Sequence, residues 1–330
     1  MSGGTTTVET ELAAPRRRWL GINVLRDYGI VIAFMALFIT LSIASDAFLT
    51  TTNLLNILNQ NAPLAIIACG GTLVIIAGGF DLSVGAIFAL SGVIAAKLAN
   101  SVDPVFGLAI GLFVGLGCGI ANGLIVAYVR VNPFIATLAT GYVFRGIATL
   151  ITSAFLVSVT NTDFTIIGQY QFAGVDIAIW IFAIVALILT VVLARTAFGR
   201  YIYAVGGNAE AARLSGVRVN IVRAATFAIS GMCAALAGLI AASKDATGNA
   251  QAGLGFELTA IAAIVVGGTS IAGGEGAIWR SVLGILLIAL IGNGFNLLNI
   301  DPFYQSLVQG LIILIAVGVD VWARASRDRA

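Results

Sequence analysis

The sequence contains no histidine, and only 10% of its 330 residues are charged. The absence of histidine excludes catalysis by an imidazole base and metal sites with histidine ligands. A soluble domain carries about a quarter charged residues. Here 59% of the residues are hydrophobic and the mean hydropathy is +1.04, so much of the apolar surface has to face lipid. The sequence predicts an all-α, polytopic membrane protein.

Cysteine and proline are also scarce, at three and five residues. Cys69, Cys118 and Cys233 lie in apolar runs without metal-ligand spacing, which indicates packing residues. The sequence has no HExxH metal motif, no nucleophile–base pair and no GxxxxGK[ST] phosphate loop. We therefore expect no cofactor or metal in this chain, and any ATP has to bind to a partner chain. Glycine is abundant at 39 residues, as is typical of closely packed membrane helices.

Ten apolar runs have the length of membrane spans, which need roughly 17–25 residues. The second, third and eighth are short and rich in glycine, which suggests broken or re-entrant helices. The transmembrane domain is predicted over 28–322, between an N-terminal tail (1–27, disordered over about 1–15) and a C-terminal tail (323–330). The predicted spans are 28–45, 62–78, 83–99, 105–128, 133–153, 176–194, 223–242, 257–271, 276–297 and 304–322.

Lys and Arg residues fix the orientation of these spans, because cytoplasmic loops carry an excess of both. With the N-terminus inside, all 17 except Lys97, Arg145 and Lys244 fall on the cytoplasmic side. Both termini are then cytoplasmic. The cytoplasmic residues are Arg16, Arg17, Arg18, Arg26, Arg130, Arg195, Arg200, Arg213, Arg218, Arg223, Arg280, Arg324, Arg327 and Arg329.

The longest polar interruption is the loop 195–223, which holds five of these arginines and one acid. Its middle predicts a short helix from Asn208 to Gly216. Asn208 is a good N-cap, Glu210 lies in the first turn, where the helix dipole favours an acid, and Gly216 is a good stop. Two interpretations stay open: an ordinary positive loop, or a helix that binds a cytoplasmic partner.

Polar side chains inside the spans are candidates for a translocation path, since such groups usually face a bundle interior or a water-filled cavity. Asp81 and Ser83 either cap the helix that follows them or contact cargo. Arg145 either reaches the interface, pairs with an acid or lines a path. Glu257 is expected at the outer surface, in the first turn of the eighth span. The tentative path comprises Asn61, Asp81, Ser83, Asn122, Thr137, Arg145, Asn293 and Asn296.

Two stretches resemble each other within the chain. LAIIACGGTLVIIAGG (64–79) and AIAAIVVGGTSIAGG (260–274) are each followed by a polar corner. Internal repeats are common in transporters. A convergent composition of Gly, Ala and Ile explains the likeness equally well.

The segment EAARLSG (210–216) fits the EAAxxxG pattern of ABC-importer permeases, although the Leu-Pro that follows in the fuller pattern is absent. Longer stretches make the chain, over about 50–322, resemble the permeases of the ribose, xylose and galactose type. These stretches are GGFDLSVGAIFALSG (78–92), FIATLAT with Arg145 downstream (134–145), GRYIYAVGGNAEAARLSGVRVN (199–220), ELTAIAAIVVGGTSIAGGEGAI (257–278) and NGFNLLNIDPFYQ (293–305).

This resemblance implies a bacterial inner-membrane subunit that imports a pentose or hexose by alternating access. It implies a second permease chain, identical or related, a periplasmic sugar-binding protein, and a cassette ATPase that binds ATP and Mg. Membrane lipid surrounds the chain, and no nucleic-acid partner is expected. The resemblance places a coupling helix over Asn208, Glu210, Ala211, Ala212, Arg213 and Gly216.

Other functions remain as alternatives. Another solute, such as a nucleoside, a sugar-like signal or an amino acid, would suit the same architecture. An ion-coupled secondary transporter would need carboxylates near the middle of the bilayer, and the spans offer few besides Asp81. An intramembrane enzyme would need catalytic residues that the sequence lacks.

Overall fold

The computed structural model describes residues 19–301 and, after them, 303–305, 307, 308, 310, 311, 314 and 318. Of residues 19–28 only the backbone is described. The tail 323–330, most of the predicted tenth span and the predicted disorder over 1–15 therefore lie outside the described residues. Seven described helices are long and apolar enough to cross a membrane. The predicted all-α, polytopic class is confirmed.

The helices follow the predicted order of spans, with short extra elements in the loops. They are α1 (Trp19–Ala44), α2 (Thr51–Ile76), α3 (Val84–Ser101), α4 (Pro104–Leu124, continued by the π-helical turn η1, Ile125–Val129), α5 (Pro133–Thr152), the 3₁₀ turn η2 (Thr162–Thr165), α6 (Ile166–Gln169), α7 (Ile177–Arg195), α8 (Ala197–Gly207), α9 (Ala209–Leu214), α10 (Val219–Asp245), α11 (Phe256–Val266) and α12 (Ile278–Leu297).

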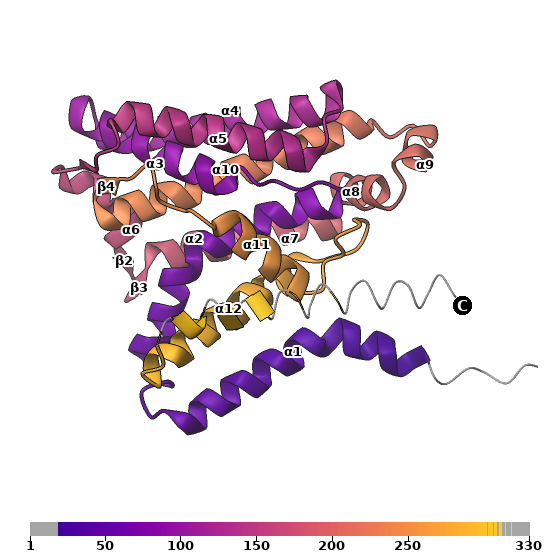
Figure 1. The fold of residues 1–330 in the computed structure, drawn as a ribbon, viewed down its shortest axis with the longest axis horizontal. Coiled ribbons are helices and arrows are strands. Elements are labelled where there is room, and N and C mark those ends of the chain that lie inside the picture. Colours follow the sequence, from indigo (N-terminus) through magenta and orange to yellow (C-terminus); the bar gives the residue numbers. More distant parts are fainter. Residues whose placement is uncertain are drawn as a thin grey trace, which may run out of the picture.

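Helices α4 and α5 form one side of the molecule and α1 the other, with α2, α3 and α10 between them (Figure 1). Most residues of α2, α3 and α10 are buried, whereas most residues of α4, α5 and α7 are partly or fully exposed. The main hydrophobic core lies where α2, α3, α7, α10, α11 and α12 meet. The exposed apolar side chains of α4, α5 and α7 are those expected against lipid.

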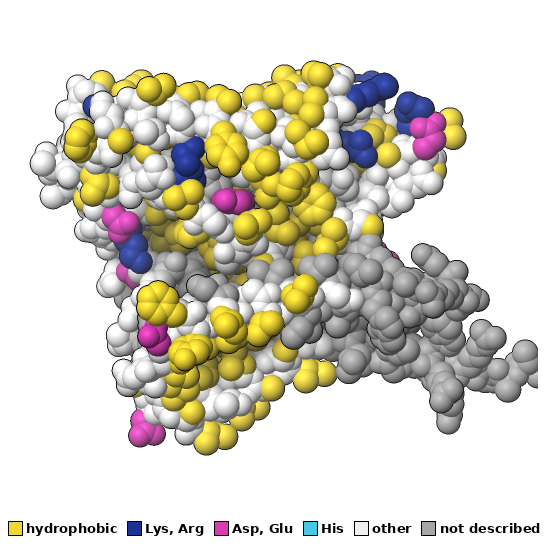
Figure 2. Space-filling model, viewed as in Figure 1, with side chains coloured by type: hydrophobic (Ala, Val, Ile, Leu, Met, Phe, Trp, Pro, Cys, Tyr) yellow, Lys and Arg dark blue, Asp and Glu magenta, His cyan; other side chains and the backbone are white. Residues whose placement is uncertain are grey.

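The two ends of the bundle differ in charge and structure. Helices α8 and α9 lie at one end, where Lys and Arg side chains gather (Figure 2). We call it the basic end, defined by Arg130, Arg195, Arg200, Arg213, Arg218 and Arg223. The opposite, hairpin end carries four two-residue strands, β1 (Val157–Ser158) paired antiparallel with β4 (Thr247–Gly248), and β2 (Gln171–Phe172) with β3 (Val175–Asp176).

Glycine lets α4 pack closely on its neighbours. Gly107, Gly111, Gly115, Gly119 and Gly123 recur every fourth residue and are all buried. A Cβ on Gly115 would lie 2.8 Å from the Gly231 carbonyl oxygen of α10, and one on Gly119 would lie 3.0 Å from the Ala228 Cα. The stripe brings the α4 backbone against α3 and α10, the small-residue packing that membrane helices use in place of a hydrophobic driving force.

Two of the three predicted breaks are wrong. The second span was expected from residue 62, but α2 begins at Thr51 and runs unbroken for 26 residues, with Pro63 inside it. The polar run at its start is helical because its side chains find partners: the Asn59 amide, for example, donates to the Asp176 carboxylate. Helix α3 is continuous too.

The third break, in the eighth span, is confirmed. Helix α10 ends where Ala246 takes a positive φ, and α11 has only 11 residues. Between them the chain forms the short strand β4 and then a series of turns, and it lies along α3, with Gly248 against Val93 and Gly253 against Gly85. We call residues 246–255 the unwound segment. It runs beside α3 without forming a helix of its own.

The predicted position of Glu257 at the outer surface is wrong. Glu257 does lie in the first turn of α11, as expected. Its carboxylate, however, occupies the space beside Gly85, at the start of α3, where a Cβ would otherwise lie. At 1.5 Å per residue, Gly85 lies about 24 Å along α3 from its other end, Ser101. Because the unwound segment forms no helix, α11 begins deep within the bundle.

Two turns and the end of helix α8 meet at the basic end through backbone contacts. The Gly274 amide donates to the Ile76 carbonyl at 2.8 Å, and a Cβ on Gly206 of α8 would collide with that carbonyl and lie 2.6 Å from the Gly274 nitrogen. The two stretches that resemble each other, 64–79 and 260–274, both end here, at Gly79 and Gly274. We call Gly78, Gly206, Gly273 and Gly274 the glycine junction.

Candidate functional site

Helix α9 is the short loop helix that the sequence predicts. The Asn208 side chain accepts a hydrogen bond from the Ala211 amide at 2.9 Å, which confirms the N-cap. At the other end, Gly216 has a φ of +85°. The Gly216 amide donates to the Arg213 carbonyl and the Val217 amide to the Ala212 carbonyl, both at 3.0 Å. This is the Schellman pattern, in which the left-handed residue is usually glycine.

One side of α9 packs on the core and the other side is exposed. Ala212 is buried in the main core, so this residue contacts its own chain rather than a partner. Glu210 and Arg213 form an exposed ion pair of 2.7 Å. Leu214 is 81% exposed, an apolar side chain in water at the tip of the loop. The exposed side of α9 therefore has a small charged and apolar surface on a rigid support.

The sequence reasoning missed α8, which supports α9. Its buried residues Gly199, Ile202 and Val205 recur at helical spacing and pack on the core, while Arg200 and Tyr201 are exposed. The Tyr203 hydroxyl donates to the Gly276 carbonyl at 2.7 Å. This amphipathic pattern was the signal that would have revealed the helix.

Four of the predicted path residues meet in a buried cluster at the break between α2 and α3. The Asp81 carboxylate accepts from the Ser83 hydroxyl at 2.6 Å and from the Ser230 hydroxyl of α10 at 2.8 Å. The Asn122 amide of α4 donates to the Ser83 hydroxyl at 2.7 Å. The Thr137 hydroxyl of α5 accepts from the Leu82 amide at 2.9 Å.

This cluster joins four helices rather than lining an opening. All four side chains are buried. Of the two interpretations for Asp81, the geometry favours the structural one, since its carboxylate also accepts from the Ser83 amide before the first turn of α3. Ser83 itself makes no capping bond with its side chain.

We expect Asp81→Ala to destabilise the protein by about 1–3 kcal/mol, because buried hydroxyl donors lose their acceptor. Asp103→Ala is the matched control: it removes an exposed N-cap, whose side chain accepts from the Phe106 amide, and such a loss costs about 1 kcal/mol. Thermal unfolding in detergent should show the larger loss for Asp81→Ala. A variant with unchanged stability that no longer transports would instead make Asp81 a path residue.

Arg145 holds the unwound segment. Its Nη1 donates to the Ala250 carbonyl at 2.7 Å and to the Ala252 carbonyl at 3.2 Å. The hydrogen bonds of this guanidinium therefore go to backbone carbonyls, and none of the three predicted roles is decided by them. The half-buried side chain leaves a role in a path open.

The remaining predicted path residues lie apart from that cluster. At the hairpin end, Asn293 of α12 and Asn53 of α2 exchange two amide hydrogen bonds of 3.2 and 2.7 Å. Asn296 is exposed one turn further on. The Asn61 side chain donates to the Ile57 carbonyl within its own helix. The eight residues predicted as one path therefore form separate groups.

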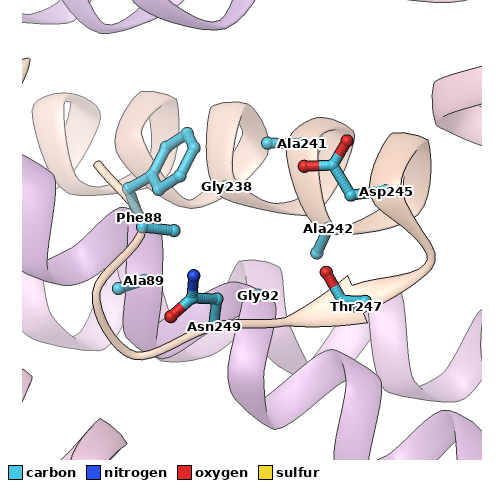
Figure 3. A pocket seen from close by; sticks show the side chains of 10 residues that line it. Phe88, Ala89, Gly92, Gly238, Ala241, Ala242, Asp245, Thr247 and Asn249 are labelled. Atoms are coloured by element: carbon cyan, nitrogen blue, oxygen red, sulfur yellow. The ribbon is translucent and has the colours of Figure 1, made fainter. Parts of the chain in front are cut away.

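A cavity of about 70 Å³ lies between α3, α10 and the unwound segment (Figure 3). Figure 3 shows Thr247 and Asn249 on the unwound segment, Asp245 at the end of α10 and Phe88 on α3 around it. The cavity has room for a few water molecules. It is smaller than the ~300–1,000 Å³ of ligand pockets, so it is not a cargo site in this conformation.

Comparison with known proteins gives close relatives over nearly the whole chain. The ribose import permease protein RbsC of Bacillus subtilis (strain 168) is 41% identical over 301 residues, 90% of this chain and 94% of the relative. RbsC of Escherichia coli (strain K12) is 40% identical over 312 residues, 92% of this chain and 96% of the relative.

The L-arabinose transport system permease protein AraH of Escherichia coli (strain K12) is 36% identical over 315 residues, 95% of this chain and 96% of the relative. No solved structure matches the chain. A family model described as "Branched-chain amino acid transport system / permease component" matches residues 53–317. The chain therefore belongs to this family of transport-system permeases and is a multi-pass transporter subunit.

Proposed function

We propose that this chain is the membrane subunit of an ABC importer for a monosaccharide, a pentose or a hexose. The observation that carries the proposal is the match to sugar permeases along almost the entire chain. Ribose and L-arabinose appear in the names of the relatives above, and D-allose in that of a third permease, which is 41% identical over 84% of this chain. The sugar itself is left open.

In this proposal the basic end faces the cytoplasm and α9 docks into a cassette ATPase. The positive-inside rule supports the orientation. The buried Ala212 and the contacts of α8 support a coupling role for α9. A helix that is packed on its own core can transmit the movement of a partner to the rest of the chain. ATP and Mg then bind to the partner, and the exposed side chains Glu210, Ala211, Arg213 and Leu214 form the contact.

The hairpin end then faces the periplasm and receives the loaded binding protein. A second permease chain, identical or related, completes the path, because the buried cluster around Asp81 fills the interior of a single chain. ATP binding would close the cassettes and move both α9 helices, so that the side open to the path alternates.

Two alternatives fit less well. The family description names branched-chain amino acids, but the names of the three relatives given above specify ribose, D-allose and L-arabinose, which favours a sugar. An ion-coupled transporter would use a carboxylate within the membrane to bind its ion. Both Asp81 oxygens accept hydrogen bonds from serines, which opposes that use.

We expect the chain to co-purify in mild detergent with a cassette ATPase encoded beside it. In proteoliposomes, the matching binding protein loaded with its sugar should stimulate ATP hydrolysis, and the same protein without sugar should stimulate less. A panel of pentoses and hexoses would identify the cargo. Absence of the ATPase from the complex, with uptake that follows an ion gradient, would overturn the proposal.

A further inference from the structure

The unwound segment places polar groups where a lipid-facing helix would have none. Non-helical backbone at membrane depth is tolerated only where protein buries it or where it lines a water-filled cavity. One side of the segment borders the polar cavity through Thr247, Asn249 and Ala252. The other side meets Arg145 and leads into Glu257.

One carboxylate oxygen of Glu257 accepts no hydrogen bond. Its Oε2 atom is buried against Gly85 and makes no hydrogen bond. A carboxylate oxygen in that state is costly, because it has lost water and gained no partner. A donor from outside the chain can satisfy this oxygen once movement of the chain uncovers it.

Arg145 and Glu257 lie on one face. Each is the only charged residue of its helix, α5 and α11. Their neighbours Tyr142, Leu254 and Leu258 are 75%, 59% and 61% exposed. Figure 2 shows a few charged side chains among many hydrophobic ones on the face of the molecule that it draws. Charged side chains at this depth usually face a bundle interior or a water-filled cavity rather than lipid.

We propose that Glu257 and Arg145 form a contact point for the hydroxyl groups of a monosaccharide partway along the translocation path. The inference rests on the proposed function and names residues for it. A carboxylate only accepts hydrogen bonds and a guanidinium only donates them, so together they complement a hydroxyl, which does both. The two charges cancel, which suits an uncharged cargo. The unwound segment sets the spacing, because Arg145 is fixed to its carbonyls.

Thiol labelling tests whether water reaches the surface around Arg145 and Glu257. Leu258→Cys places a thiol next to Glu257, and Gly117→Cys places one on the exposed side of α4, where nothing lies within 4 Å of a Cβ. The unaltered chain, with Cys69, Cys118 and Cys233, gives the background. In the assembled complex in proteoliposomes, a charged methanethiosulfonate should modify Leu258→Cys and leave Gly117→Cys unmodified.

The same labelling tests for sugar. D-ribose, D-allose and L-arabinose, each in turn at high concentration, should include one that slows the modification of Leu258→Cys. An unreactive thiol would mean that lipid or a tight protein contact covers the face, and the inference would be overturned. Reaction that no sugar slows would overturn it as well.

Glu257→Gln tests the carboxylate itself. Binding-protein-dependent uptake should fall about tenfold or more, the loss expected when a hydrogen bond to a charged group is removed. Glu257→Asp, which keeps the charge, should retain more uptake than Glu257→Gln, and both should assemble and melt like the unaltered complex. Equal uptake by Glu257→Gln would disprove the contact point alone. Failure of the unaltered chain to bind an ATPase would instead disprove the proposed function.

Discussion

Gly119→Leu is expected to abolish the folded protein, whereas Gly117→Leu, two residues away on the same helix, should leave it intact. A Cβ on Gly119 would collide with the Phe227 carbonyl and lie 3.0 Å from the Ala228 Cα. The cost exceeds the ~1–3 kcal/mol of a typical overpacked core, because helix backbone cannot rotate away as a side chain can. Around Gly117, nothing lies within 4 Å of a Cβ.

The measurement is the fraction of monodisperse protein after extraction in mild detergent, followed by thermal unfolding. Gly117→Leu serves as the matched control, since it adds the same side chain to the same helix on its exposed side. Similar behaviour of the two variants would contradict the packing of α4 on α10 described above. Intermediate loss in Gly119→Ala would indicate that the two helices can separate by a small amount.

Glu210→Arg is expected to reduce ATP-driven uptake to background while the protein stays folded and inserted. Glu210 is 63% exposed, and an exposed ion pair contributes only about 0–1 kcal/mol to folding. Placed against a partner, the new arginine brings a like charge or an unpaired one, which costs several kcal/mol at an interface. The loss should therefore appear in coupling rather than in stability.

A charge swap separates the two roles of the pair. The double variant Glu210→Arg with Arg213→Glu restores an ion pair within α9 but reverses the surface that a partner meets. Uptake should remain lost in the double variant if docking is what matters. Recovery of uptake would show that the pair only stabilises the helix, and normal uptake by Glu210→Arg alone would refute the assignment of α9 as a coupling helix.

The sequence predicted best what local signals specify. Helix α9 follows from its cap, its acid in the first turn and its terminal glycine, and all three behave as expected. Most spans follow from the length of apolar runs. The glycines of the eighth span also predicted its interruption. They did not show at which end of the span the helix is missing.

The failures have a common physical cause, which is that a polar residue reveals its partner only in three dimensions. Asn59 precedes the predicted start of the second span at residue 62, yet it lies within helix α2, where its amide donates to Asp176, far along the chain. Glu257 suggested a surface position because no local signal reports that residues 246–255 are unwound. The path residues were grouped by polarity alone, and their partners divide them into separate sets.

The glycine junction has a consequence for how force travels through the chain. When two elements shift, contacts between side chains can adjust by a change of rotamer. Contacts between backbones without side chains cannot adjust in this way. We therefore expect the turns at Gly78 and Gly274 and the end of α8 at Gly206 to move as one rigid unit. A push on α9 through α8 would reach both the start of α3 and the end of α11 at once, so the Asp81 cluster and the half-helix that carries Glu257 would tilt together.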